Sequence, residues 1–311
     1  MKLVADYKDG DRLTSQLLIV NALKGVTNNG LTYFTLDLRD SSGQINAKKW
    51  EVTAEDEAIF VPGNVIEATF EVIFYKNSLQ LKIFSAKALK EDEIDISLFA
   101  KQAPVAYDVL IEKLHNYINS ITDDELKTIL LHILKKYKTK FLTYPAAASI
   151  HHDYLNGLLH HTVSMADHAS YLADYYPNVD KSLLLTAVIL HDIGKTVELE
   201  GKVVYKYSLE GKLLGHISIM SAEISKAKDE LNLTSEKILL LQHMILSHHG
   251  QLEYGSPVMP LTKEALLLTL IDNLDSKMVI VEKALEQTEK GEFTNKVFAL
   301  DNRMFYKHQQ D

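Results

Sequence analysis

The adjacent pair His191-Asp192, followed closely by Lys195, is the part of this sequence whose residue types most directly suggest chemistry. An imidazole nitrogen and a carboxylate oxygen side by side can hold a divalent cation together. His161 and Asp272 stand in other apolar stretches, before and after the pair. A single inward histidine is more often a hydrogen-bonded core residue, but a buried carboxylate is costly unless its charge is compensated. The combination of these residues therefore predicts a metal site.

Helices are expected to carry this site, because apolar residues recur at intervals of three and four beyond Asp92. His191 shares an apolar face with Leu184, and Asp272 shares one with Leu268. Both side chains should therefore point into a helical bundle, where metal sites are commonly built. The predicted helices are Val105–Ser120, Asp123–Tyr137, Leu159–Tyr175, Lys181–Ile193, His216–Leu231, Ser235–His248 and Lys263–Thr288.

The first 90 residues follow a different period, that of strands. Phe34 and Leu36 belong to an alternating run, and turns are indicated at Asp40–Gly43 and Tyr75–Ser78. About five strands fit into this length, with a short polar or helical stretch at 53–59, which predicts a small closed barrel. The commonest all-β barrel of this size is the OB-fold.

The composition narrows the classes of protein further. Hydrophobic residues make up 46% of the chain and charged residues 24%, as in ordinary soluble globular proteins. Without cysteine, disulfides and thiolate ligands are excluded, so a metal must bind to histidine and carboxylate. The net charge of -9 argues against a protein that coats duplex nucleic acid by charge alone. Neither a membrane span nor a signal peptide is recognisable, so we expect a cytoplasmic protein.

Three segments of the helical part, HTVSMA, LLTAVILHDIGK and LIDNLDS, resemble the HD superfamily of metal-dependent phosphohydrolases. They reproduce the superfamily's order of H, HD and D within residues 150–290. The resemblance implies that the ligands of a first metal are His161, His191, Asp192 and Asp272.

A second metal is implied by the same resemblance. Gly215-His216 and the pair His248-His249 are similar to the extra ligands of the two-metal members of the superfamily. His216 and His248 are the implied ligands, and His249 is either the substitute for His248 or a contact to substrate or to a carboxylate. Asp192 is expected to touch both ions and is therefore the predicted catalytic carboxylate.

Two divalent cations can lower the pKa of a bound water and stabilise the leaving oxygen of a phosphodiester. Ligands without sulfur favour Mn²⁺, and Mg²⁺, Fe²⁺, Co²⁺ and Ni²⁺ are also compatible. Lys195 has two interpretations. It is either a catalytic group that neutralises a phosphate oxygen or one half of an ion pair on a loop.

The predicted barrel offers four candidate contacts to nucleic acid. The strand alternation places Tyr33, Lys48 and Trp50 on the face opposite the core, and Tyr75 lies beside a hairpin tip. OB-folds bind single strands by stacking bases on such aromatic residues. For each residue, the alternative is packing against the helical half. Basic and acidic residues are equal in number over 1–90, so stacking should outweigh charge.

An N-terminal OB-fold followed by an HD domain resembles the YhaM-type 3′-5′ exoribonucleases of bacteria. The matching segments are GQINAKKW in the barrel and PAAASIHHDYLNGLLHHT ahead of the HD pair. Asn156 and His160 differ from the residues usual at these positions in that family, but neither residue is a predicted ligand or catalytic group. The resemblance implies a hydrolase, a nuclease that degrades single-stranded RNA, and single-stranded DNA in vitro, from the 3′ end to nucleoside 5′-monophosphates.

Two other functions remain open at this point. One is an HD-type nucleotidase or cyclic-dinucleotide phosphodiesterase with a regulatory barrel, and the other is a non-catalytic protein that binds single strands. The oligomeric state and the preference for RNA or DNA stay open as well. The predicted architecture is multidomain: an all-β OB-fold at 1–90, a helical connector at 91–150, an all-α HD bundle at 151–290 and a C-terminal tail at 291–311.

Overall fold

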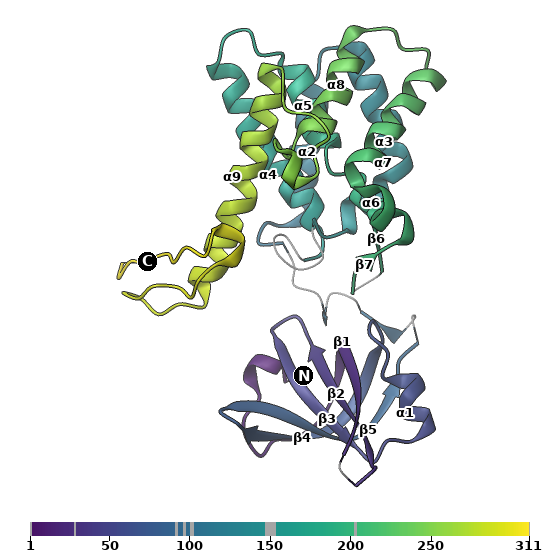
Figure 1. The fold of residues 1–311 in the computed structure, drawn as a ribbon, viewed down its shortest axis with the longest axis vertical. Helices are drawn as coiled ribbons and strands as arrows, with labels where there is room; N and C mark the ends of the chain where they lie inside the picture. The colour runs from purple at the N-terminus through teal and green to yellow at the C-terminus, as the bar shows by residue number, and fades with distance from the viewer. Residues whose placement is uncertain are drawn as a thin grey trace. The chain divides into compact units, whose positions relative to one another are not determined.

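The computed structural model describes residues 2–27, 29–90, 93–95, 98–99, 103–146, 154–201 and 204–310. The chain divides into two compact units, Met1–Gln102 with Gly201–Lys206, and Ala103–Glu200 with Tyr207–Asp311 (Figure 1). The predicted fold class is confirmed, because a closed barrel of five strands is followed by an α-helical region. The domain boundaries at 90, 150 and 290 stay a prediction. Residues 147–153, which include His151 and His152, lie outside the described residues.

The barrel strands run in the order β1-β2-β3-β5-β4. Strands β3 and β5 are parallel, and the other neighbouring pairs are antiparallel. The stretch at 53–59 contains helix α1 (Ala54–Ile59), which begins with a capping box between Thr53 and Asp56. The strands are β1 (Arg12–Val26), β2 (Thr32–Arg39), β3 (Gln44–Trp50), β4 (Val65–Tyr75) and β5 (Ser78–Ala88).

Alternation along these strands separates a buried core from an outer face. Leu36 is fully buried, whereas Tyr33 and Trp50 are paired across β2 and β3 on the outer face. Lys49 is the exception, because its side chain follows the core parity and is buried. Its ammonium lies 3.6 Å from the Asp56 carboxylate and donates to the Trp50 carbonyl, so the buried charge is compensated.

The helical unit has one apolar core, to which every long helix contributes. Helix α5 is surrounded by the others, since all its residues from Ser182 to Leu190 are buried. Two short strands, β6 (Leu199–Glu200) and β7 (Lys206–Tyr207), pair with each other. The helices are α2 (Tyr107–Ser120), α3 (Asp124–Thr143), α4 (Gly157–Tyr175), α5 (Lys181–Leu190), α6 (Lys195–Glu198), α7 (Leu209–Glu230), α8 (Glu236–Ser247) and α9 (Lys263–Glu286). Among the described residues, no helix is both long enough and apolar enough to cross a bilayer.

Two helix boundaries differ from the predicted ones in a way that matters for the site. The helix predicted to reach Ile193 ends at Leu190, where the Ile193 N–H bonds to the Leu190 carbonyl and tightens the chain. The helix predicted to begin at His216 is the second half of α7, which bends at Gly215 with a φ of 70°. Both differences leave a histidine beside a break in a helix instead of within a regular helix.

After α9, residues 291–308 form a hairpin that we call the C-terminal arm. Backbone bridges join Phe293 to Tyr306 and Val297 to Arg303. The Lys307 ammonium donates to two carbonyls at the end of α9. No described residue of the arm belongs to the bundle core. The stretch expected as a tail is thus a folded hairpin attached to the end of α9.

Candidate metal centre

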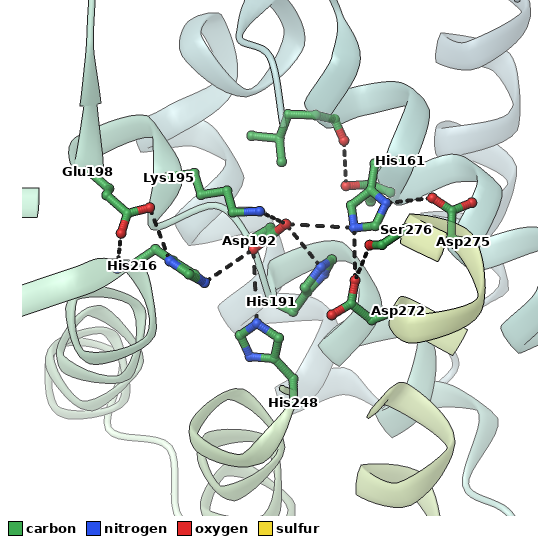
Figure 2. Close-up of polar contacts among 12 residues, drawn as sticks. His161, His191, Asp192, Lys195, Glu198, His216, His248, Asp272, Asp275 and Ser276 are labelled. Carbon is green, nitrogen blue, oxygen red and sulfur yellow. Dashed lines mark hydrogen bonds and ion pairs between the residues drawn. The ribbon is translucent and has the colours of Figure 1, made fainter. Parts of the chain in front are cut away.

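The predicted ligands come from five places in the helical unit and meet at one point, as Figure 2 shows. Because α5 is buried on all sides, the pair that follows it is presented at the middle of the bundle. The contributing positions are His161 on α4, His191-Asp192 in the turn after α5, His216 at the bend of α7, His248 at the end of α8 and Asp272 on α9.

Two of the histidines are oriented by main-chain carbonyls. His191 Nδ1 donates to the Val188 carbonyl at 2.8 Å, and His248 Nδ1 donates to the Ile245 carbonyl at 2.7 Å. A carbonyl can only accept, so Nδ1 carries the proton in both rings. The Nε2 atom of each ring therefore offers a lone pair toward the interior.

The other two histidines are oriented by carboxylates. His161 Nδ1 donates to Asp275 at 2.7 Å, and Asp275 also accepts a hydrogen bond from Ser164. His216 Nδ1 donates to Glu198 at 3.0 Å, and the same carboxylate accepts from the His216 backbone N–H at 3.2 Å. A carboxylate behind an imidazole fixes the tautomer and raises the basicity of the opposite nitrogen. All four rings thus direct Nε2 to the same place.

Several of these inward atoms have no hydrogen-bond partner among the described residues. They are the Nε2 atoms of His191, His216 and His248 and the Oδ1 atom of Asp192, all buried. Buried polar atoms are nearly always satisfied, and a set of acceptors without donors is costly. A cation between them would satisfy the whole set at once. The donor atoms present therefore fit a bound divalent metal.

Asp192 lies between two groups of imidazoles. Its Oδ2 is 3.3 Å from His191 Nε2 and 3.7 Å from His161 Nε2. Its Oδ1 is 3.5 Å from His216 Nε2 and 4.0 Å from His248 Nε2. One carboxylate therefore faces both groups, each with a different oxygen.

The first group consists of His161, His191 and Asp192, whose donor atoms lie within 4.8 Å of one another. Asp272 belongs beside it, because its Oδ1 is 3.4 Å from His161 Nε2. Ser276 donates to the same oxygen at 3.3 Å. The structure thus brings together the four residues predicted to bind a first metal.

The second group consists of His216, His248 and His249, whose donor atoms also lie within 4.8 Å of one another. The rings of His248 and His249 are 4.3 Å apart at their centroids, and His216 is 5.2 Å from His249. Both interpretations of His249, ligand and substrate contact, are compatible with this position.

The electrostatics of the centre favour positive charge. Burial opposes ionisation of Asp192, but Lys195 and His191 hold the pKa of its carboxyl well below the usual range. Burial also disfavours a charge on His161, yet Asp272 and Asp275 raise its pKa to about 10. The pKa of His248 is lowered by burial and by the neighbouring His249. The first group thus attracts a cation, while burial keeps His248 of the second group neutral and able to bind one.

Lys195 lies inside the site. Its Nζ donates to Asp192 Oδ2 at 2.6 Å, and only 12% of its side chain is exposed. Burial lowers the pKa of the ammonium, but Asp192 outweighs burial and raises it. Of the two interpretations of Lys195, the ion pair is present, and it is made with the central carboxylate.

A glycine allows the two groups to approach each other. A Cβ atom at Gly194 would overlap the His216 carbonyl oxygen, so only glycine permits α6 to pack against the bend of α7 at this point. Gly211 similarly faces the Glu198 backbone. The chain between the HD pair and the second group is therefore packed backbone against backbone.

Two residues of the centre had no ligand or catalytic role in the sequence prediction, Asp275 and Glu198. The helical period does direct Asp275 inward, because it follows Asp272 by one turn on the same face of an amphipathic helix. No comparable signal marks Glu198. It reaches His216 only because α6 and α7 meet across the chain reversal between them.

The barrel brings together three of its four candidate residues. The rings of Tyr33 and Trp50 are 5.0 Å apart, and the Lys48 ammonium lies 4.8 Å from the Tyr33 ring centroid. Tyr75 is elsewhere on the surface: it pairs with Ser78, whereas Lys48 pairs with Lys82 further along β5. At about 3.3 Å per residue, the separation along the strand is roughly 13 Å.

Comparison with known proteins finds one family model within the helical unit and two solved structures of low similarity to this chain. Residues 158–277 match the family model described as the HD domain. The second OB-fold domain of replication protein A from Methanococcus maripaludis is 17% identical, covers 28% of this chain and 93% of its own, and has a TM-score of 0.25. The protein priB from Ralstonia solanacearum is 16% identical, covers 27% of this chain and 100% of its own, and has a TM-score of 0.21. At these scores neither likeness bears on function. The chain therefore contains an HD domain, the domain of a superfamily of metal-dependent phosphohydrolases, within its helical unit.

Proposed function

We propose that this chain is a two-metal phosphodiesterase that removes nucleotides from the 3′ end of single-stranded RNA and releases nucleoside 5′-monophosphates. Single-stranded DNA is a second substrate in this proposal. The observation that carries the metal-dependent part is the convergence of four Nε2 atoms on Asp192, each from a ring whose Nδ1 is already bonded. This arrangement suits metal binding and serves no evident packing purpose.

The chain would divide its ligands between two ions. His161, His191 and Asp272 would hold the first ion, and His216 and His248 would hold the second. His249 is the alternative ligand to His248. Asp192 is the shared ligand in this proposal, because its two oxygens face the two groups separately. When bound, such a pair of ions activates water and stabilises the charge on the leaving oxygen of a phosphodiester.

Asp192 and Lys195 are the proposed catalytic residues. The Lys195 ammonium holds Oδ2 of Asp192, which keeps Oδ1 directed at the second group. The same buried positive charge would stabilise a phosphate oxygen as its negative charge increases. Because all proposed ligands are imidazoles or carboxylates, Mn²⁺ is the favoured metal, and Mg²⁺, Fe²⁺, Co²⁺ and Ni²⁺ remain compatible.

The barrel is proposed to bind the single strand. Tyr33 and Trp50 offer stacking surfaces side by side, and Lys48 adds a cation beside them. Phe84, which is 45% exposed, lies two residues beyond the Lys82 partner of Lys48 and extends this surface. From here on, the term outer face of the barrel refers to the surface formed by four of these residues, Tyr33, Lys48, Trp50 and Phe84. The direction of digestion and the preference for RNA rest on the resemblance to YhaM-type enzymes.

The experiment that tests the proposal is digestion of a 5′-labelled single-stranded RNA with Mn²⁺, comparing the wild type with His191→Ala. Stepwise shortening with retention of the label is expected from the wild type only. Release of the labelled nucleotide at once would contradict the polarity, and equal digestion by both proteins would contradict the HD site. Hydrolysis confined to mononucleotides or cyclic dinucleotides would favour a nucleotidase or cyclic-dinucleotide phosphodiesterase. Protein without divalent metal and without activity in Mn²⁺ would favour a non-catalytic binding protein.

A further inference from the structure

Helix α9 has a second apolar face, on the side opposite the bundle core. Its inward residues, such as Leu268 and Ile271, are buried. Its outward residues include a row at intervals of four, which we call the α9 row. It consists of Leu266, Leu270, Leu274 and Met278, each exposed by 48 to 55%. A helix that is apolar on more than one face is normally covered on both.

The C-terminal arm carries a second exposed apolar surface. Phe298 is 87% exposed, and Phe293, Met304 and Tyr306 are exposed by 40 to 61%. These residues belong to a folded hairpin, closed by backbone bridges and tied to the end of α9 through Lys307. An isolated two-stranded hairpin is marginally stable in water, and exposed aromatic residues on one add a further cost. The exposed aromatic side chains of the arm therefore form an apolar surface suited to a partner.

We propose that a second copy of this chain covers both surfaces, with the C-terminal arm of each copy against the α9 row of the other. The area is sufficient: the eight side chains of the two surfaces expose on the order of 800 Å², the share of each partner in an interface of standard size. A two-fold dimer uses the same patch on both copies, so the C-terminal arm of each copy contacts the α9 row of the other.

The geometry of α9 supports this exchange. Residues at intervals of four form a continuous ridge along one side of a helix, and an apolar surface of the partner can cover that ridge. In an antiparallel pair, the end of one α9 meets the beginning of the other. The arm starts directly after α9 (Figure 1), and so would reach the Leu266 end of the partner row. The arm also lacks the acidic excess of the chain, since Lys296, Arg303 and Lys307 outnumber its two acidic residues.

The mass of the full chain in solution tests the proposal directly. Analytical ultracentrifugation over a wide concentration range should show twice the 35.1 kDa of one chain. Phe298→Glu combined with Leu266→Glu should raise the dissociation constant at least about tenfold, because exposed anchors become charged. The matched control is Leu239→Glu, since Leu239 is an exposed leucine on α8 at 63%. It should leave the mass unchanged.

Three outcomes would overturn the dimer. They are a monomer at every concentration, a double variant that associates like the wild type, and a control that dissociates equally.

Cross-linking keeps the proposal testable if the charged variant unfolds. The sequence has no cysteine, so Phe298→Cys and Leu266→Cys create single reactive positions. Copies carrying the two different substitutions are mixed and treated with a short bifunctional maleimide. A cross-linked dimer is expected from this mixture, and none from Phe298→Cys mixed with Leu239→Cys. Cross-linking that is absent from the first mixture, or equal in both, would overturn the arrangement.

Discussion

The metal centre and the outer face of the barrel differ in how their functional residues are held. Four imidazoles of the centre, those of His161, His191, His216 and His248, are buried or nearly so and have Nδ1 bonded to a fixed acceptor. On the barrel, Trp50 is 44% exposed and lies against the Tyr33 ring, and the Lys48 ammonium beside that ring donates to the Thr35 hydroxyl. A buried centre tolerates little displacement, because each atom is determined by the core around it. An exposed face adapts to its ligand. The loss of one side chain there should lower the binding affinity only moderately, because the remaining side chains still contact the ligand.

The largest effect is expected at Asp192, because Asp192→Asn removes the charge that faces both groups. Hydrolysis of single-stranded RNA should fall by about 10³-fold or more, beyond the 10–100-fold typical of residues that only orient ligands. Binding of the strand, measured in the presence of a chelator, should not change. Asp174→Asn is the control, since Asp174 is exposed on α4. Activity of Asp192→Asn close to that of the wild type would refute the shared-ligand role.

Divalent metal should stabilise the helical unit and leave the barrel unaffected. At a Mn²⁺ concentration about 100 times the dissociation constant, the free energy of unfolding should rise by about 2.7 kcal/mol. Far-UV circular dichroism follows the helices, while the single tryptophan, Trp50, reports on the barrel. His191→Ala should abolish the stabilisation. An equal shift of the Trp50 transition would show that the two regions are not independent.

Glu198→Gln should weaken the second group without dismantling it. The amide cannot hold His216 Nδ1–H as strongly as the carboxylate, so Mn²⁺ affinity should fall about 10–100-fold. Excess Mn²⁺ should restore activity to Glu198→Gln but not to Asp192→Asn. Glu210→Gln, at an exposed position of α7, serves as the control. If Mn²⁺ affinity does not change, the role of Glu198 is limited to accepting the hydrogen bond from the His216 backbone N–H.

The smallest effect is expected on the barrel. Trp50→Ala should weaken single-strand binding by about 1–3 kcal/mol and raise KM with little change in kcat. Tyr75→Ala should have less effect, because Tyr75 lies apart from the other three candidates. A larger loss with Tyr75→Ala than with Trp50→Ala would place the strand on a different surface.

The same contrast explains how far the sequence could predict the molecule. The helical period and the cost of burying a charge directed His191 and Asp272 inward, and both are found there. Strand alternation similarly separated Leu36 from Tyr33. These are local patterns, in which the neighbours along the chain determine the face.

Interactions between distant segments could not be predicted in this way. Glu198 meets His216 only through the reversal between α6 and α7, and the bend at Gly215 lies directly beside that contact. The separation of Tyr75 from Trp50 follows from the parallel pairing of β3 with β5, a register that no turn specifies. The folded C-terminal arm has the polar composition of a tail, and its bridges join residues on both sides of a loop.

A substitution at Gly194 can change the distance between the two groups of the centre without removing any of their donor atoms. A methyl group there would press on the His216 carbonyl and displace the imidazole, while every donor atom of both groups remained in the sequence. Gly194→Ala would thus yield a protein chemically complete at its centre but altered in the spacing between its halves. Comparing how many ions each form retains would reveal whether the reaction requires the pair or only one member of it.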